Sequence, residues 1–161
     1  MIRNVRKEDI AAIAAIYNRY IADTCITFET EPVSDEEMGR RIRSFTGKGY
    51  PCLVCEEGGR VAGYCYAHAW KEKQAYSRTA ETTVYLHPDC KGRGLGKELM
   101  KTLVDACRQS GLHVLIACIT VPNEASVRLH ESLGFRQVSR FNEVGQKFGR
   151  WLDVYDFQLT L

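Results

Sequence analysis

The residues best suited to chemistry lie in a glycine-rich turn between a strand-like segment and an amphipathic run. Gly92, Gly94 and Gly96 alternate with a cation or an apolar residue, and Lys91 and Lys97 flank them. Glycines let a backbone approach a ligand closely, and the first amides of a helix are unpaired donors in a positive potential. Such a turn is suited to binding a phosphate group.

The spacing of this turn excludes two common phosphate motifs. The nucleotide-binding P-loop requires Ser or Thr after its Gly-Lys pair, but Gly96-Lys97 is followed by Glu98. The dinucleotide fingerprint requires glycine where Lys97 stands. The pattern resembles instead the Q/R-x-x-G-x-G/A signature of the GNAT acetyltransferases, with Lys91 in place of the usual Gln or Arg. That resemblance implies that the turn binds the pyrophosphate of coenzyme A.

Composition and charge are those of an ordinary soluble globular protein. The 161 residues are 45% hydrophobic and 26% charged, with a net charge of +2. We therefore expect one domain over residues 1–161, with neither a nucleic-acid nor a membrane partner. The polar N-terminus does not read as a signal peptide. Seven cysteines at uneven spacing suggest reduced thiols in the cytoplasm, and the Cys52/Cys55 pair lacks the further ligands of a zinc site.

The periodicity of the chain predicts alternating strands and helices without repeats or linkers. An apolar helical stripe covers residues 10–21, and Ser34 with Glu37 forms a capping box that begins a second helix. The other expected elements are strands over 51–56, 60–70, 78–86, 113–121, 135–143 and 148–159, a helix after the glycine turn with Leu95 facing the core, and a short helix over 123–132. This order predicts an α/β (α+β) sandwich, a mixed and largely antiparallel sheet flanked by helices. It is the architecture of the GNAT fold.

Acetyl transfer from a thioester to an amine requires a base for the ammonium and donors for the tetrahedral oxyanion. Glu81 lies in the strand before the glycine turn and is the candidate base; the alternative is a surface glutamate paired with Arg78 or Lys73. The expected oxyanion donor is a backbone amide of Val84, Tyr85 or Leu86. The Asn123 side chain is expected to bind the pantetheine amides, to cap the following helix, or both.

The protonation of the departing thiolate is less determined by the sequence. GNAT enzymes often have a tyrosine in the helix after Asn123, and here His130 is the polar candidate, either as acid or base or as a structural residue. Tyr85 is the other nearby hydroxyl. His68, His87 and His113 show no pairing pattern and are interpreted as structural.

Longer segments sharpen the resemblance, over nearly the whole chain, to the phosphinothricin acetyltransferases and to relatives that acetylate methionine sulfoximine and sulfone. It rests on Thr27 to Pro32, Gly63 to Ala67, Trp70 to Glu81, Pro122 to Glu131 and Phe148 to Val154. It implies an acetyl-CoA-dependent enzyme without a metal that acetylates the α-amino group of a small amine in detoxification, and forms a homodimer.

The resemblance also implies a set of binding residues. The cofactor would contact Val84, Tyr85, Leu86, Lys91, Gly92, Arg93, Gly94, Leu95, Gly96, Lys97, Asn123 and Ser126. The acceptor would contact Phe28, Tyr66, Lys71, Lys73, Tyr76, Arg78, Thr79, Glu81 and Thr83. Lys73 stands where the phosphinothricin enzymes can have arginine, and it cannot make the same two-pronged contact.

Two alternatives stay open at this stage. A GNAT enzyme that acetylates a peptide or protein amine would need an open groove, whereas the segment from Thr24 to Pro32 looks like a lid over a small pocket. A non-catalytic acyl-CoA-binding module would keep the glycine turn and lose the base, yet both Glu81 and Asn123 are present.

Overall fold

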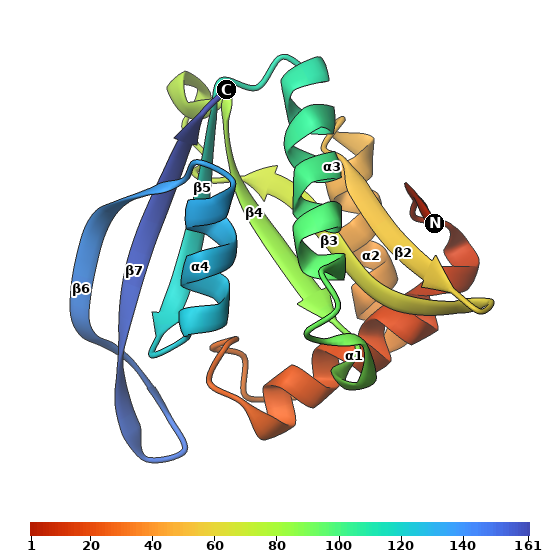
Figure 1. Cartoon of the computed structure of the whole chain (residues 1–161), viewed down its shortest axis with the longest axis horizontal. Helices are drawn as coiled ribbons and strands as arrows, with labels where there is room; N and C mark the ends of the chain where they lie inside the picture. The colour runs from red at the N-terminus through yellow and green to blue at the C-terminus, as the bar shows by residue number, and fades with distance from the viewer.

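One mixed sheet organises the chain. The computed structural model describes residues 1–161 and contains a seven-stranded sheet in the order β1-β2-β3-β4-β5-β7-β6 (Figure 1). The strands are β1 (Ile2–Asn4), β2 (Cys52–Glu57), β3 (Arg60–Ala69), β4 (Thr79–Leu86), β5 (Val114–Val121), β6 (Arg136–Lys147) and β7 (Arg150–Thr160). Only β4 and β5 run parallel. The expected mixed, largely antiparallel sheet flanked by helices is therefore confirmed.

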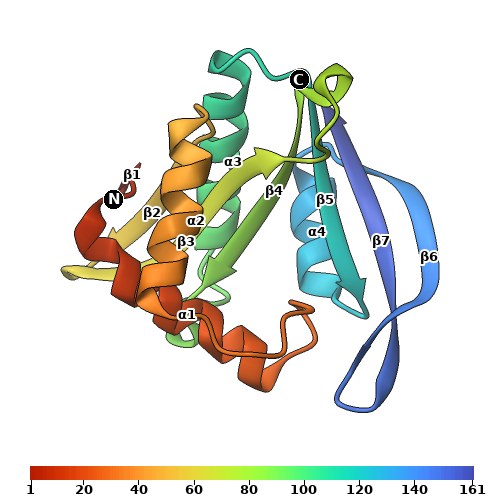
Figure 2. The same cartoon turned by 180° about the vertical axis from the view of Figure 1, so that it is seen from behind.

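Helices cover both faces of the sheet. They are α1 (Ile10–Asp23), α2 (Asp35–Gly47), α3 (Leu95–Gln109) and α4 (Glu124–Ser132). Helices α3 and α4 lie in front of the sheet in Figure 1, and α1 and α2 lie on the opposite face, which Figure 2 turns toward the viewer. Each face has its own apolar core, and Cys52 and Cys55 of β2 enter different cores because they lie three residues apart on a strand.

The parallel pair β4 and β5 separates soon after it forms. Register pairs run only from Thr79↔Val114 to Glu81↔Ile116, after which the two strands diverge (Figure 1). β4 stays paired with β3 on its other side as far as Leu86. Beyond Glu81 the β5-facing edge of β4 is therefore open, and backbone groups there are available to a ligand.

Most predicted elements occur within one or two residues of their expected bounds. Ser34 caps α2 by accepting from the Glu37 amide, and Asn123 caps α4 by accepting from the Ser126 amide. The prediction was wrong at the last hairpin, where β6 continues four residues beyond Glu143. Register shifts between Gln137 and Ser139 and between Phe141 and Gly145 hide its alternation, and Glu143 takes a positive φ of 51° within the second shift. No helix of the chain is long and apolar enough to cross a membrane.

A substitution at Gly63 tests the close contact between β3 and the end of β4. A Cβ at this position of β3 would lie 2.5 Å from Leu86 Cδ2 and 2.9 Å from the carbonyl oxygen of Tyr85. We expect Gly63→Ala to lower the free energy of unfolding by about 1–3 kcal/mol, because a backbone oxygen must move. Denaturant titration measures this change. Gly47→Ala is the control, because a Cβ at this helical position meets nothing within 4 Å, and it should leave stability unchanged or raise it by up to about 1 kcal/mol.

Candidate active site

The glycine turn and the separated strands form a cleft of about 450 Å³. Its walls come from β4, the glycine turn, the start of α3 and one side of α4. The predicted cofactor residues that line it are Val84, Leu86, Lys91, Gly92, Gly94, Gly96, Lys97, Asn123 and Ser126. Gly92 and Gly94 have φ values of 74° and 82°, so the turn requires glycine there. The amides of the first turn of α3 and two lysines thus face one cavity, as a phosphate site demands.

Two predicted residues of the turn point elsewhere. Both terminal nitrogens of the Arg93 guanidinium donate to the Glu57 carboxylate, at 2.9 and 3.3 Å, so this cation ties the turn to the β2–β3 hairpin. The Leu95 side chain is buried in the core beneath α3. Neither side chain lines the cleft, and a cofactor role for either stays a prediction.

The three candidate oxyanion amides differ in their surroundings. The His87 amide donates to the Ala62 carbonyl of β3, and the alternation of an antiparallel pair then directs the Tyr85 amide toward β3 as well. The Val84 and Leu86 amides face the open edge. The Tyr20 hydroxyl lies 3.3 Å from the Leu86 nitrogen and donates to the Leu86 oxygen at 2.8 Å. The Val84 amide is therefore the unobstructed donor.

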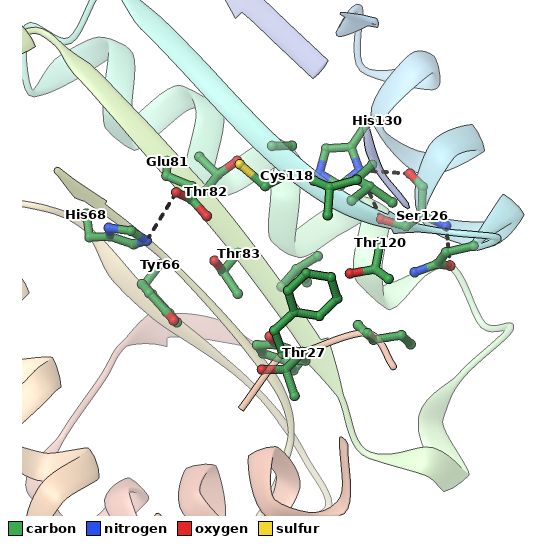
Figure 3. A pocket seen from close by; sticks show the side chains of 18 of the residues that line it. Thr27, Tyr66, His68, Glu81, Thr82, Thr83, Cys118, Thr120, Ser126 and His130 are labelled. Carbon is green, nitrogen blue, oxygen red and sulfur yellow. Dashed lines mark hydrogen bonds and ion pairs between the residues drawn. The ribbon is translucent and has the colours of Figure 1, made fainter. Parts of the chain in front are cut away.

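A second cavity of about 350 Å³ adjoins the first and shares Ile26, Val84, Asn123 and Ser126 with it. Figure 3 shows Tyr66, Glu81 and Thr83 projecting toward this space from β3 and β4. Phe28 lies in its wall. The residues predicted for the base and for part of the acceptor site thus meet directly beside the cofactor cleft.

Glu81 does not pair with the cations that the alternative interpretation required. The Arg78 guanidinium donates to the carbonyl of Gly111, at 3.0 Å. The Glu81 carboxylate instead faces His68, whose Nε2 lies 4.0 Å from Oε2 (Figure 3). Cys118 of β5 lies on its other side, and partial removal from water, together with the Glu81 and Asp156 carboxylates, raises the pKa of that thiol.

The loop from Thr24 to Pro32 lines one side of the second cavity, here called the acceptor cavity after the predicted acceptor residues in it, and is fixed by polar contacts at Thr27. Its carbonyl accepts from the buried Lys147 ammonium at 2.9 Å, and its hydroxyl lies 2.8 Å from the Tyr17 hydroxyl. Tyr17 also donates to Glu29, whose carboxylate receives both terminal nitrogens of Arg41, at 2.7 and 2.8 Å. The Arg41 guanidinium holds the pKa of Glu29 below its usual value, while burial lowers the pKa of Lys147. The predicted lid is thus a fixed wall held by α1, α2 and β6.

His130 is buried at the far side of the acceptor cavity and its Nδ1 lies 2.8 Å from the Ser126 carbonyl oxygen. A carbonyl only accepts, so Nδ1 carries the proton, and burial lowers the pKa of the ring. A neutral ring whose one N–H is already donated has no proton free for a thiolate, so the geometry favours the base or structural role over the acid. Tyr85 packs edge-on against Tyr17 and Tyr20, and burial raises its pKa.

Five of the predicted acceptor residues lie outside both cavities, namely Lys71, Lys73, Tyr76, Arg78 and Thr79. They belong to the β3–β4 connection and the first residue of β4, where the chain passes the end of the sheet. The Lys71 ammonium lies 4.2 Å from the centre of the Trp70 ring and 5.4 Å from that of Tyr76. That these five residues contact the acceptor stays a prediction, because none of them lines a cavity of the single chain.

Several residues of the acceptor cavity were not predicted, among them Tyr17, Thr27, His68, Cys118 and Thr120. Interpreting His68 as merely structural was incomplete, because it lines the cavity opposite Glu81. One signal was available: His68 lies two residues from Tyr66 on the same strand and therefore on the same face. Nothing in the sequence indicated that β5 would contribute Cys118 and Thr120.

Comparison with known proteins identifies the family to which this chain belongs. The profile of the acetyltransferase (GNAT) domain matches residues 2–155. The chain belongs to the GNAT acetyltransferase family. It is an acyltransferase that uses acetyl-CoA as its cosubstrate. An acetyltransferase structure from Salmonella typhimurium that contains acetyl-CoA superposes on it with a TM-score of 0.98, at 40% identity over 100% of this chain and 93% of the other.

Relatives with different named acceptors are about equally similar. An L-amino acid N-acyltransferase of Escherichia coli K12 is 42% identical over 99% of this chain and 93% of its own length. A phosphinothricin N-acetyltransferase of Streptomyces coelicolor is 42% identical over 96% and 92%. A structure described as a ribosomal-protein-alanine N-acetyltransferase, from Brucella melitensis, has a TM-score of 0.98 at 34% identity, over 100% of this chain and 99% of that one. The shared fold therefore leaves the choice of acceptor to the details of the site.

A substitution at Gly145 tests whether Phe28 forms part of the wall of the acceptor cavity. A Cβ on this residue of β6 would lie 2.3–2.9 Å from three atoms of the Phe28 ring, so the ring must turn away in Gly145→Ala. We expect KM for the acceptor to rise about tenfold, by analogy with the 1–3 kcal/mol cost of overpacking, while KM for acetyl-CoA stays unchanged. Steady-state kinetics with each substrate varied in turn measures both. An unchanged acceptor KM would contradict the assignment of Phe28 to the wall.

Proposed function

We propose that this enzyme transfers the acetyl group of acetyl-CoA to the α-amino group of small amino acid analogues, namely phosphinothricin, methionine sulfoximine and methionine sulfone. The observation that carries the proposal is the small acceptor cavity of about 350 Å³, lined on one side by the anchored loop and joined to the cofactor cleft beside Glu81. A cavity of this size suits a single amino acid, whereas an extended peptide needs an open groove. Detoxification is the role that we propose for the reaction.

The residues present support a simple sequence of steps. Glu81 takes a proton from the ammonium of the acceptor, and the free amine attacks the thioester carbonyl. The Val84 amide on the open edge of β4 stabilises the oxyanion that forms. The carbon–sulfur bond then breaks, the nitrogen loses its second proton to solvent, and the thiolate of coenzyme A leaves and takes up a proton from solvent. Tyr66, Thr83 and Phe28 orient the acceptor from β3, β4 and the loop.

Release of thiol from acetyl-CoA tests the proposal when measured against the three analogues, ordinary amino acids and short peptides. We expect turnover to be confined to the small compounds, and Glu81→Gln to lower it about 10²-fold or more, because the amide cannot accept the proton. Acetyl-CoA binding, measured by calorimetry, should be retained by the variant.

The control is Glu72→Gln, which removes an exposed carboxylate from the β3–β4 connection outside both cavities. It should retain wild-type turnover. Activity on peptides alone would contradict the proposal and favour an enzyme that acetylates peptide or protein amines. Unchanged turnover in Glu81→Gln would overturn the assignment of the base.

We further propose that the enzyme acts in the cytoplasm as a homodimer. All seven cysteines are free thiols, a state that a reducing compartment preserves. The β6–β7 hairpin at the edge of the sheet exposes five large apolar side chains, Val138, Phe141, Val144, Phe148 and Trp151, each between 48% and 61% exposed. Exposed apolar side chains on an edge hairpin favour burial against another chain. We propose that a second copy of this chain covers them in the homodimer.

Molar mass in solution tests the dimer. We expect light scattering to give about twice the 18.3 kDa of the chain for the wild type, and the monomer mass for the double variant Phe141→Glu/Trp151→Glu, because two charges would be buried without partners. Gln109→Glu adds a charge at the exposed end of α3 and should leave the mass unchanged. A wild-type mass of one chain would contradict the dimer.

A further inference from the structure

His68 holds a specific position relative to Glu81. The register of β3 and β4 places the two residues directly opposite each other, with their side chains on the same face. His68 Nε2 lies 4.0 Å from Glu81 Oε2, and the side chains are 27% and 28% exposed. The imidazole therefore has both a close approach to the carboxylate and access to solvent.

The orientation of the His68 ring is fixed from three sides. Its Nδ1 lies 2.9 Å from the carbonyl oxygen of Ala69, which can only accept, so Nδ1 carries the proton of the neutral ring. The ring also stacks on Phe45 of α2, with centroids 5.4 Å apart, and lies 5.8 Å from the ring of Tyr66. These contacts leave the Nε2 lone pair directed toward Glu81.

The hydroxyl of Tyr66 and the thiol of Cys118, which lie next to Glu81, hold their protons. Burial raises the pKa of Tyr66, and partial removal from water with the charge of Glu81 and Asp156 raises that of Cys118. Asp156 of β7 adjoins Cys118 rather than His68, and α2 contributes the uncharged Phe45. The His68 Nε2 is therefore the available proton acceptor next to the carboxylate.

We propose that His68 is the second member of a proton relay, receiving from Glu81 the proton that Glu81 takes from the acceptor amine. This inference rests on the proposed role of Glu81. The ammonium N–H bond breaks as the Glu81 O–H bond forms; that O–H bond then breaks as the Nε2–H bond forms, and the imidazolium releases a proton to solvent. The 4.0 Å gap exceeds a hydrogen bond by about 1 Å, so the relay requires the two side chains to move closer in the substrate complex, as catalytic hydrogen bonds commonly do.

The pH dependence of turnover tests the relay. A ring that is already protonated cannot accept, so kcat of the wild type should fall toward acidic pH. His68→Phe keeps the stacking on Phe45 and removes both nitrogens; we expect kcat about 10- to 10²-fold lower, KM for acetyl-CoA unchanged, and a pH profile that differs from that of the wild type on its acidic side, since only Glu81 then has to be unprotonated. Added imidazole should partly restore the turnover of His68→Ala. If His68 were purely structural, its replacement would leave the shape of the pH profile unchanged, and imidazole would not restore the turnover of His68→Ala.

Two comparisons separate the relay from the proposed function. His113→Gln alters an exposed histidine at the start of β5, outside both cavities, and should behave as wild type in every measurement. If Glu81→Gln loses turnover while His68→Phe retains wild-type kcat, the relay is overturned and the base stands. If His68→Phe is slow but has the same pH profile as the wild type, and imidazole does not restore the turnover of His68→Ala, the relay is likewise overturned. Wild-type turnover in Glu81→Gln would overturn both proposals.

Discussion

The site depends on the separation of β4 from β5. A strand inside a sheet normally satisfies its amides on both edges, but β4 has a paired neighbour on only one side beyond Glu81. The exposed backbone on the open edge is the reason a cofactor with amide groups can lie there as a substitute strand. Without further support an open edge would be costly, since removing unpaired backbone N–H and C=O groups from water raises the free energy of the folded protein. The Tyr20 hydroxyl meets part of this requirement at Leu86, and the rest remains for the ligand.

The two cores give this open edge its rigidity. α3 packs Leu99, Met100 and Leu103 against one face of the sheet with no exposure of any of them, while α1 buries Ile13 and Ile16 against the other face. β4 is therefore fixed from both faces, through Ala80 in one core and Tyr85 in the other, whereas β5 is fixed from the α3 side by Leu115, Ala117 and Ile119. A rigid gap costs little reorganisation when cofactor binds, and preorganised donors are the more effective for stabilising an oxyanion.

The sequence predicted the elements and the cofactor side of the site better than the acceptor side. The glycine turn, the amphipathic pattern of α3 and the cap at Asn123 are local features, and each occurs where its spacing indicated. The acceptor cavity is made by segments far apart in the chain: Thr27 meets Lys147 across 120 residues. Such contacts leave no periodicity to read. The predicted acceptor contacts of the connection between β3 and β4 stay a prediction: in the single chain Lys71 lies against Trp70 and Tyr76, and Arg78 donates to a carbonyl.

The way the loop is anchored has a consequence for how this enzyme can change over evolution. Thr27 is held through its carbonyl and its hydroxyl, whereas its neighbours Ile26 and Phe28 lie in the cavity wall and are about 40% exposed. Substitutions at these two positions can reshape the pocket without removing the polar contacts of Thr27 or altering the residues that we propose as proton acceptors. Acceptor preference is thereby separable from catalytic chemistry, which allows one scaffold to diverge toward new amines while the transfer reaction is conserved.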